Sequence, residues 1–190
     1  YIFTYTNFES IGMGSQYDVD LSSLDTSKVV DMSGLFCGCS NLLILDLNYF
    51  DTSLVANMSS IFESCSNLST VDLSTINTSQ VTDMSYMFYN CEKLETISNI
   101  DMKSVTSNSY ATSMFDGCKN LKNLNIKNLL VSLKIGSGTT WGHLLTFDSL
   151  LNTIKELWSM APTYARTLTI GSANLEKISN TYVKLIDVTD

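Results

Sequence analysis

The chain has 190 residues, 44% of them hydrophobic, which is enough for one domain with a packed core and is not typical of a disordered segment. Its net charge of −8, with basic residues scattered singly, argues against a surface that binds nucleic acid or anionic membranes. The hydrophobic runs are short, and none approaches the roughly 18 residues that a membrane-spanning helix needs.

Residues 1–16 precede the first clear sequence repeat, and we expect them to form an N-terminal capping segment. The chain begins at Tyr1 rather than at Met, so we expect it to be part of a longer protein.

An internal repeat of 26 residues then occupies residues 17–130, with three units that align without gaps and a fourth that carries one inserted residue. A unit of this length cannot bury its apolar face alone and is stabilised by stacking on its neighbours, as in a solenoid. The hydrophobic residues that recur in register are Leu21, Leu47 and Leu73; Val29, Val55 and Val81; Met32, Met58 and Met84; Phe36, Phe62, Phe88 and Phe115; Cys39, Cys65, Cys91 and Cys118; and Leu42, Leu68, Leu94 and Leu121.

Each repeat is predicted to contain one strand and one short helix. Val71, Asp72 and Leu73 alternate between apolar and polar, which is typical of a strand. The apolar residues from Met58 to Cys65 recur at i, i+3, i+4 and i+7, which predicts two helical turns. The residues at the expected helix N-caps are Asp31, Asn57 and Asp83. The fold class expected is therefore α/β, a solenoid with parallel strands on one face and short helices on the other.

Residues 131–190 differ from the repeats and are predicted to form a larger, repeat-like C-terminal unit. Leu133–Ile135 and Leu168–Ile170 are each expected to be strands. Between them, the apolar spacing from Leu150 to Trp158 predicts a longer amphipathic helix, capped at Thr146 or Asp148.

The repeat phrase DTSxVxDMSxxFxxCxNLxxLDL resembles the BspA-like leucine-rich repeats of bacterial surface proteins, over roughly residues 17–130. The resemblance implies a leucine-rich-repeat solenoid and a role in adhesion or in contact with a host or matrix. It implies no catalytic residues and fixes no ligand-binding residue. The segments SLLNTIKELW and TLTIGSANLEKI, within residues 145–178, resemble a C-terminal unit found beside such repeats in prophage tail-associated proteins.

The cysteine column could indicate metal ligands or disulfides, but we interpret it as a row of buried, reduced thiols. Metal sites usually gather ligands from C-x-x-C pairs, whereas these cysteines occur once per repeat. Stacked side chains that point the same way also suit the geometry of a disulfide badly. Cys37 lies outside the column and is expected to be the more exposed thiol.

Two other sets of polar residues are expected to be structural. His143, beside Trp141 in a loop rich in Gly and Thr, has no carboxylate near it in sequence before Asp148, so a catalytic role is not expected. The Asx residues that precede Thr-Ser in each repeat could bind calcium, but they fit the capping of corner turns better. These residues are Asp25, Asp51 and Asn77.

Asp20, Asp46 and Asp72 are the candidate ligand-binding residues. Each alternates with inward-facing apolar residues and should therefore point outward, in register with the others. They could form a merely solvated acidic stripe or a surface that recognises a basic partner.

The sequence therefore predicts a non-enzymatic, extracellular recognition or adhesion module that binds a protein or a glycan through its strand face. No cofactor or metal, no nucleic acid and no membrane insertion of this segment are expected. Two alternatives stay open: a structural or receptor-binding component of a phage tail, located in the virion, and an accessory domain of a longer surface enzyme.

Overall fold

The computed structural model describes residues 10–11, 24–129, 131, 133–135, 152 and 168–170. Its strands are β1 (Ser10–Ile11), β2 (Ile44–Leu45), β3 (Thr70–Asp72), β4 (Thr96–Asp101), β5 (Asn123–Lys127), β6 (Leu133–Ile135) and β7 (Leu168–Ile170), with a 3-10 helix, η1 (Asn108–Ala111), between β4 and β5. The expected N-terminal cap lies almost entirely outside the described residues, as do the expected C-terminal helix, apart from Asn152, and the loop that carries His143.

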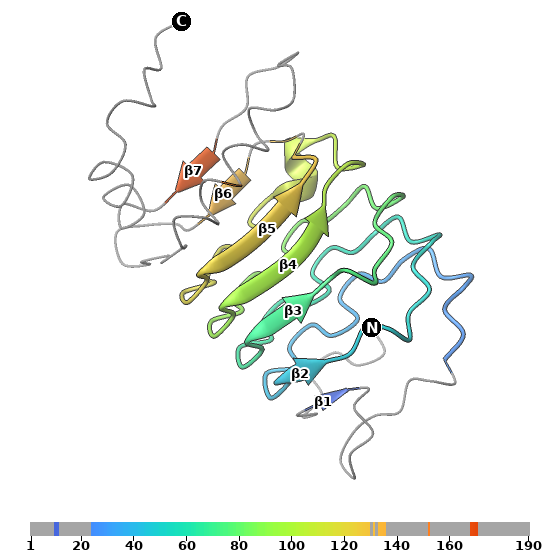
Figure 1. Cartoon of the computed structure of the whole chain (residues 1–190), viewed down its shortest axis with the longest axis horizontal. Helices are drawn as coiled ribbons and strands as arrows, with labels where there is room; N and C mark the ends of the chain where they lie inside the picture. Colours follow the sequence, from blue (N-terminus) through green and yellow to red (C-terminus); the bar gives the residue numbers. More distant parts are fainter. Residues whose placement is uncertain are drawn as a thin grey trace, which may run out of the picture.

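All the described strand pairs are parallel. β1 pairs with β2, β3 with β4, β4 with β5, and β6 with β7. Val71 of β3 lies opposite Ile97 of β4, which in turn lies opposite Leu124 of β5, so equivalent positions of successive repeats are neighbours. Figure 1 shows β1 to β5 in sequence order along one side, while the stretches that connect them run along the other side. In the described residues the sheets are thus parallel and helices are nearly absent, an arrangement consistent with a strand-rich repeat fold.

The strand predictions are confirmed where the structure describes them. Val71 and Leu73 are buried and Asp72 between them is exposed, as the alternation requires. The two strands expected in the C-terminal region are β6 and β7, which pair with Leu133 opposite Leu168.

The prediction of a short helix in each repeat is wrong, because residues 58–65 form consecutive turns instead. Within this stretch the Cys65 N–H donates to the Phe62 carbonyl three residues back (3.1 Å), whereas the Phe62 N–H donates to the Met87 carbonyl of the next repeat (3.0 Å). The backbone is left-handed at Ser60 (φ 56°) and Ser64 (φ 60°), which an α-helix does not allow. Backbone N–H groups that would donate within a helix therefore donate to carbonyls of the neighbouring repeat.

The residues that suggested a helix are nevertheless buried. A left-handed residue at every fourth position gives the turns a four-residue period, so residues three and four apart still face the same side. The described Met, Phe, Cys and Leu columns of the repeat form the core. Phe36, Phe62, Phe88 and Phe115 form one continuous stack, with successive ring centroids 5.9, 5.4 and 5.9 Å apart.

A row of buried threonines adds hydrogen bonds between repeats. The Thr26 hydroxyl donates to the Asp51 carbonyl (3.0 Å) and accepts the Asp51 N–H (2.8 Å). Thr52 makes the same two bonds to Asn77, at 3.1 and 2.8 Å. Each hydroxyl thus binds both backbone groups of one residue in the next unit, which fixes the register of the stack at this corner.

Candidate functional site

The outward face of β3, β4 and β5 carries polar side chains in register. The opposite, inward face buries Val71, Ile97 and Leu124 in the core. Because side chains alternate along a strand, the residues beside them project away from the core. The polar residues of this outward strand face are Thr70, Asp72, Thr96, Ser98, Asn99, Asp101, Asn123, Asn125 and Lys127, all exposed or half-buried.

Side-chain amides link neighbouring strands across this face. The Asn123 amide donates to the Thr96 hydroxyl (3.2 Å), and the Asn99 amide donates to the Asp72 carboxylate (3.1 Å). The pairing of β4 with β5 shifts register between Ile97 and Ile100, and Asn99 at this irregularity has a left-handed backbone (φ 61°). These bonds restrain the side chains that a ligand on this face would meet.

Asn128 repeats the arrangement one unit further along. Its backbone is also left-handed (φ 54°), and its amide donates to the Asp101 carboxylate of the preceding repeat (2.8 Å). The sequence interpretation missed both Asn99 and Asn128. The sequence did contain a signal for both positions. Each is an asparagine, the residue most tolerant of positive φ after glycine, in a unit where the repeat pattern weakens.

Of the three predicted ligand-binding aspartates, the structure describes Asp46 and Asp72. Asp72 is exposed and accepts the Ser74 N–H (3.0 Å) as well as the Ser74 hydroxyl (3.0 Å). Asp46 is half-buried and accepts the Asn48 N–H (2.9 Å). Asp20 lies outside the described residues.

The carboxylate column does not continue into β4. Opposite Asp72 lies Ser98, which carries a hydroxyl. The pKa of Asp72 is lowered, mainly by the Asn99 amide and then by the Ser74 N–H, so this group is ionised at neutral pH. The outward strand face therefore carries separate carboxylates at Asp72 and Asp101, the latter opposite Lys127, among hydroxyl and amide groups, rather than a continuous acidic stripe.

The corner residues form Asx turns, as predicted. The side-chain oxygens of Asp25, Asp51 and Asn77 accept the N–H groups of Ser27, Ser53 and Ser79 at 2.9 to 3.0 Å. The Ser27 hydroxyl and then the Ser27 N–H lower the pKa of Asp25, and the Ser53 N–H lowers the pKa of Asp51, since these bonds stabilise the charged carboxylates. The same geometry holds at Asp31, Asn57 and Asp83. Each of them caps the first turn of a turn-forming stretch (residues 33–38, 59–64 and 85–90), although no helix follows.

The cysteine column is buried, as predicted, and its thiols bind the backbone. Cys65, Cys91 and Cys118 donate to the carbonyls of Phe36, Phe62 and Phe88, respectively, at 3.0 to 3.1 Å. Burial raises the pKa values of Cys65 and Cys91 and raises the pKa of Cys118 to about 12. The five cysteines are all free, and Cys37 is half-buried whereas the four column cysteines are buried.

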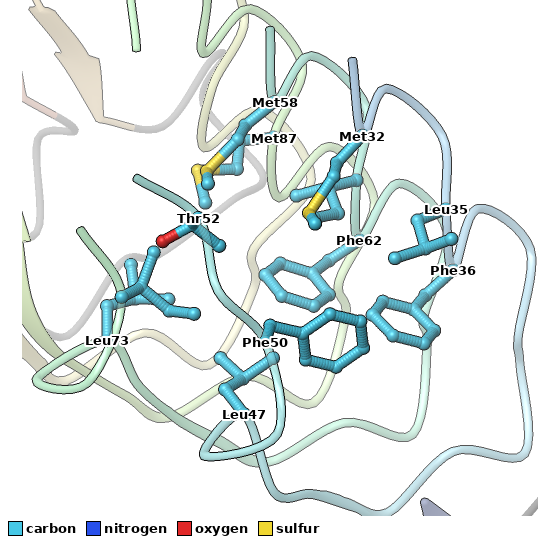
Figure 2. A pocket seen from close by; sticks show the side chains of 12 residues that line it. Met32, Leu35, Phe36, Leu47, Phe50, Thr52, Met58, Phe62, Leu73 and Met87 are labelled. Atoms are coloured by element: carbon cyan, nitrogen blue, oxygen red, sulfur yellow. The ribbon is translucent and has the colours of Figure 1, made fainter. Parts of the chain in front are cut away.

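A cavity of about 10 Å³ lies between the first repeats (Figure 2). The rings of Phe36, Phe50 and Phe62 and the thioether of Met58 project toward it. Its size suits at most about one water molecule, but its lining is nearly all apolar, and the Thr52 hydroxyl on its wall already binds Asn77. The cavity is therefore a packing gap in the core.

The described part of the chain has neither a metal-binding cluster nor a membrane-spanning helix. Within it, no cluster of three or more His, Cys, Asp or Glu side chains has the arrangement of a metal site. None of its helices has the length and apolar character needed to cross a bilayer.

Comparison with protein families places most of the chain in one of them. Residues 6–129 match the model of the family described as Mycoplasma protein of unknown function, DUF285, and the chain belongs to this family. No curated protein and no solved structure matches the chain.

Proposed function

We propose that this DUF285 chain is a non-enzymatic, extracellular recognition module that binds a protein or a glycan through its outward strand face. The fold we assign to it is a leucine-rich-repeat solenoid of the BspA-like type, with turns in place of helices. The proposal rests above all on the polar side chains that β3, β4 and β5 present in register while their opposite face is buried.

Rigidity of the face supports this proposal. The Asn99–Asp72 and Asn123–Thr96 hydrogen bonds hold side chains of adjacent strands together before any ligand arrives. A ligand that binds a preorganised surface loses less affinity to the ordering of side chains. Stacked repeats commonly provide such extended binding surfaces.

Charge favours a partner with basic groups. The chain carries a net charge of −8, and the face presents the Asp72 carboxylate, whose pKa is lowered by its hydrogen bonds. A basic partner would be attracted toward this surface, with an affinity that falls as salt screens the interaction over about 8–10 Å.

The test is binding of the purified chain to a glycan array and to a panel of purified extracellular-matrix proteins. We expect at least one ligand whose affinity falls when Asp20, Asp46 and Asp72 are all replaced by Asn, and falls further as salt increases. The same triple substitution should leave the protein folded, as its circular dichroism spectrum should show.

The matched control removes two carboxylates elsewhere: Asp25→Asn with Asp51→Asn. Asn77 shows that this corner accepts an amide, since it forms the same Asx turn. We expect this control to bind as the parent does. If the triple variant binds an identified ligand as tightly as the parent, the outward strand face is only a solvated surface, and packing against other subunits becomes the better explanation of the repeat.

A further inference from the structure

Tyr86 is an unusual residue for its position in the turn-forming stretches, on the side of the repeat away from the strands. Its equivalents in the other repeats are Gly34, Ser60 and Ser113, and all four positions have positive φ, from 52° to 61°. Only small residues occupy the other three. A bulky side chain is rare at such φ values, because the Cβ comes too close to the following carbonyl oxygen.

The Tyr86 side chain is nevertheless 40% exposed, so burial in the core does not explain it. Its ring packs edge-on against Tyr89, with centroids 5.8 Å apart and planes at 72°. The Tyr86 N–H donates to the Thr112 carbonyl (2.9 Å), so the backbone is fixed by the stack whatever the side chain is. The fold requires the positive φ at this position but does not require a bulky side chain there. The backbone strain that the tyrosine adds therefore points to a function.

Acidic residues flank the tyrosine pair in both neighbouring repeats. The Ser64 N–H donates to the Tyr89 carbonyl (2.7 Å), which places Glu63 beside Tyr89 on one side. The Asn90 N–H donates to the Asp116 carbonyl (2.8 Å), which places Asp116 on the other side.

We propose that Tyr86 and Tyr89 form an aromatic site that binds an arginine side chain of a partner polypeptide. A guanidinium group stacks on the face of an aromatic ring, and the flanking carboxylates add attraction for its positive charge. This site lies on the turn-forming side and is separate from the outward strand face, so the two surfaces can be tested independently.

The experiment is an NMR titration of the whole chain with N-acetyl-arginine amide, followed through the tyrosine ring resonances. N-acetyl-citrulline amide is the matched probe, since it has the same shape without the charge. We expect the arginine probe to shift the Tyr86 and Tyr89 resonances and the citrulline probe to shift them much less. Equal shifts with the two probes, or no shift at these two residues, would overturn the proposal.

Two variants separate binding from structure. Tyr86→Asn should weaken arginine binding about two- to fivefold and raise the urea midpoint, because Asn tolerates positive φ. Tyr110→Asn, which removes another exposed tyrosine, should leave the titration unchanged. A lower urea midpoint for Tyr86→Asn would show that packing on Tyr89 accounts for this residue, and would overturn the proposal. Asp46→Asn with Asp72→Asn should not affect the titration, so failure here is distinguishable from failure of the strand-face function.

Discussion

At the level of single residues, the turn-forming stretches depend on backbone positions with positive φ. Gly38, Ser64, Asn90 and Gly117 occupy equivalent positions in successive repeats, with φ between 57° and 84°. Three residue types are found there. Around Gly117 the neighbouring repeat lies close, because an added Cβ would lie 2.3 Å from the Asn90 Oδ1 and 2.9 Å from the Asn90 Cα.

Gly117→Ala should therefore destabilise the protein by about 2 kcal/mol or more, from left-handed strain together with the clash against backbone atoms of the adjacent repeat. Urea denaturation followed by circular dichroism measures the change. Ser64→Ala is the matched control, since Ser64 already has a Cβ at the equivalent position, and it should change stability by less than about 0.5 kcal/mol. Equal stability of the Gly117 variant and the parent would mean that the repeats are not packed this closely.

Thiol reactivity should divide the cysteines into two groups. In native protein at pH 8, a thiol reagent should modify Cys37 first, because Cys37 is half-buried and the four column cysteines are buried. Cys65, Cys91 and Cys118 should react only as fast as the protein unfolds, since burial also raises their pKa values and suppresses the thiolate. Mass spectrometry of time points measures this order. Rapid labelling of Cys65 or Cys91 without denaturant would contradict the buried column.

At the level of elements, the repeats are joined by the phenylalanine stack and by backbone hydrogen bonds between units. Phe62 has a stacked ring on each side, Phe36 at 5.9 Å and Phe88 at 5.4 Å. Thr52 binds both backbone groups of Asn77. Each contact acts between nearest neighbours, so damage to a central repeat should disconnect the two ends of the stack.

Phe62→Ala should lower the free energy of unfolding by about 3–5 kcal/mol, because it empties a fully buried site between two rings. Phe62→Leu keeps most of the volume and should cost clearly less. The comparison is made by urea denaturation of both variants. A melting temperature for Phe62→Ala within error of the parent value would place this column outside the core.

Thr52→Val should cost about 1–2 kcal/mol, since it leaves the Asn77 N–H and carbonyl without the hydroxyl that binds them. Thr75→Val removes a hydroxyl from an exposed residue of the next repeat and should have little effect. If the two valine variants unfold at the same urea concentration, the threonine row does not stabilise the stack.

The element scale also shows how far the sequence could predict this structure. The alternation around Leu73 gave the strand, and the register of the Met, Phe and Cys columns gave the stacked core. The spacing from Met58 to Cys65 gave a helix that does not form, because turns with a left-handed residue every fourth position produce the same apolar spacing. Glycine and serine at positions such as Gly34 and Ser60 were a local signal for these turns. Hydrogen bonds to the next repeat decide between the two structures, and they cannot be read from one repeat alone.

The candidate site was predictable only in part. Alternation along the strand was enough to place Asp72 outward, because burial of Val71 and Leu73 fixes the face. The side-chain bond from Asn99 depends on the irregular pairing of β4 with β5, which breaks the repeat pattern. The core was predicted from residues that recur at the same position in every repeat. Where a repeat departs from its neighbours, that inference no longer applies.

At the level of the whole molecule, charge acts on stability in two opposite ways. The net charge of −8 at pH 7 destabilises the compact state through self-repulsion, which weakens as the pH falls toward the sequence pI near 4.5. Hydrogen bonds from serine and asparagine groups lower the pKa values of Asp25, Asp31, Asp51 and Asp72, so these carboxylates favour the folded state while they are charged.

The stability of the protein should therefore pass through a maximum at about pH 5. A carboxylate whose folded pKa lies below its unfolded value near 3.9 stabilises the fold above that value, and this contribution is lost as the pH falls through the folded pKa. Urea denaturation between pH 7 and pH 2 should show a small rise down to about pH 5 and a clear decline below about pH 4. Salt at 0.5 M should flatten the rise, since screening acts on long-range repulsion, but should leave the decline, which reflects hydrogen bonds at contact distance.

Asp72→Asn should make the decline shallower, because an amide oxygen can still accept the Ser74 N–H, as Asn57 and Asn77 do in their own Asx turns. Stability that stays constant or increases from pH 4 to pH 2 would show that these turns do not favour the ionised carboxylates.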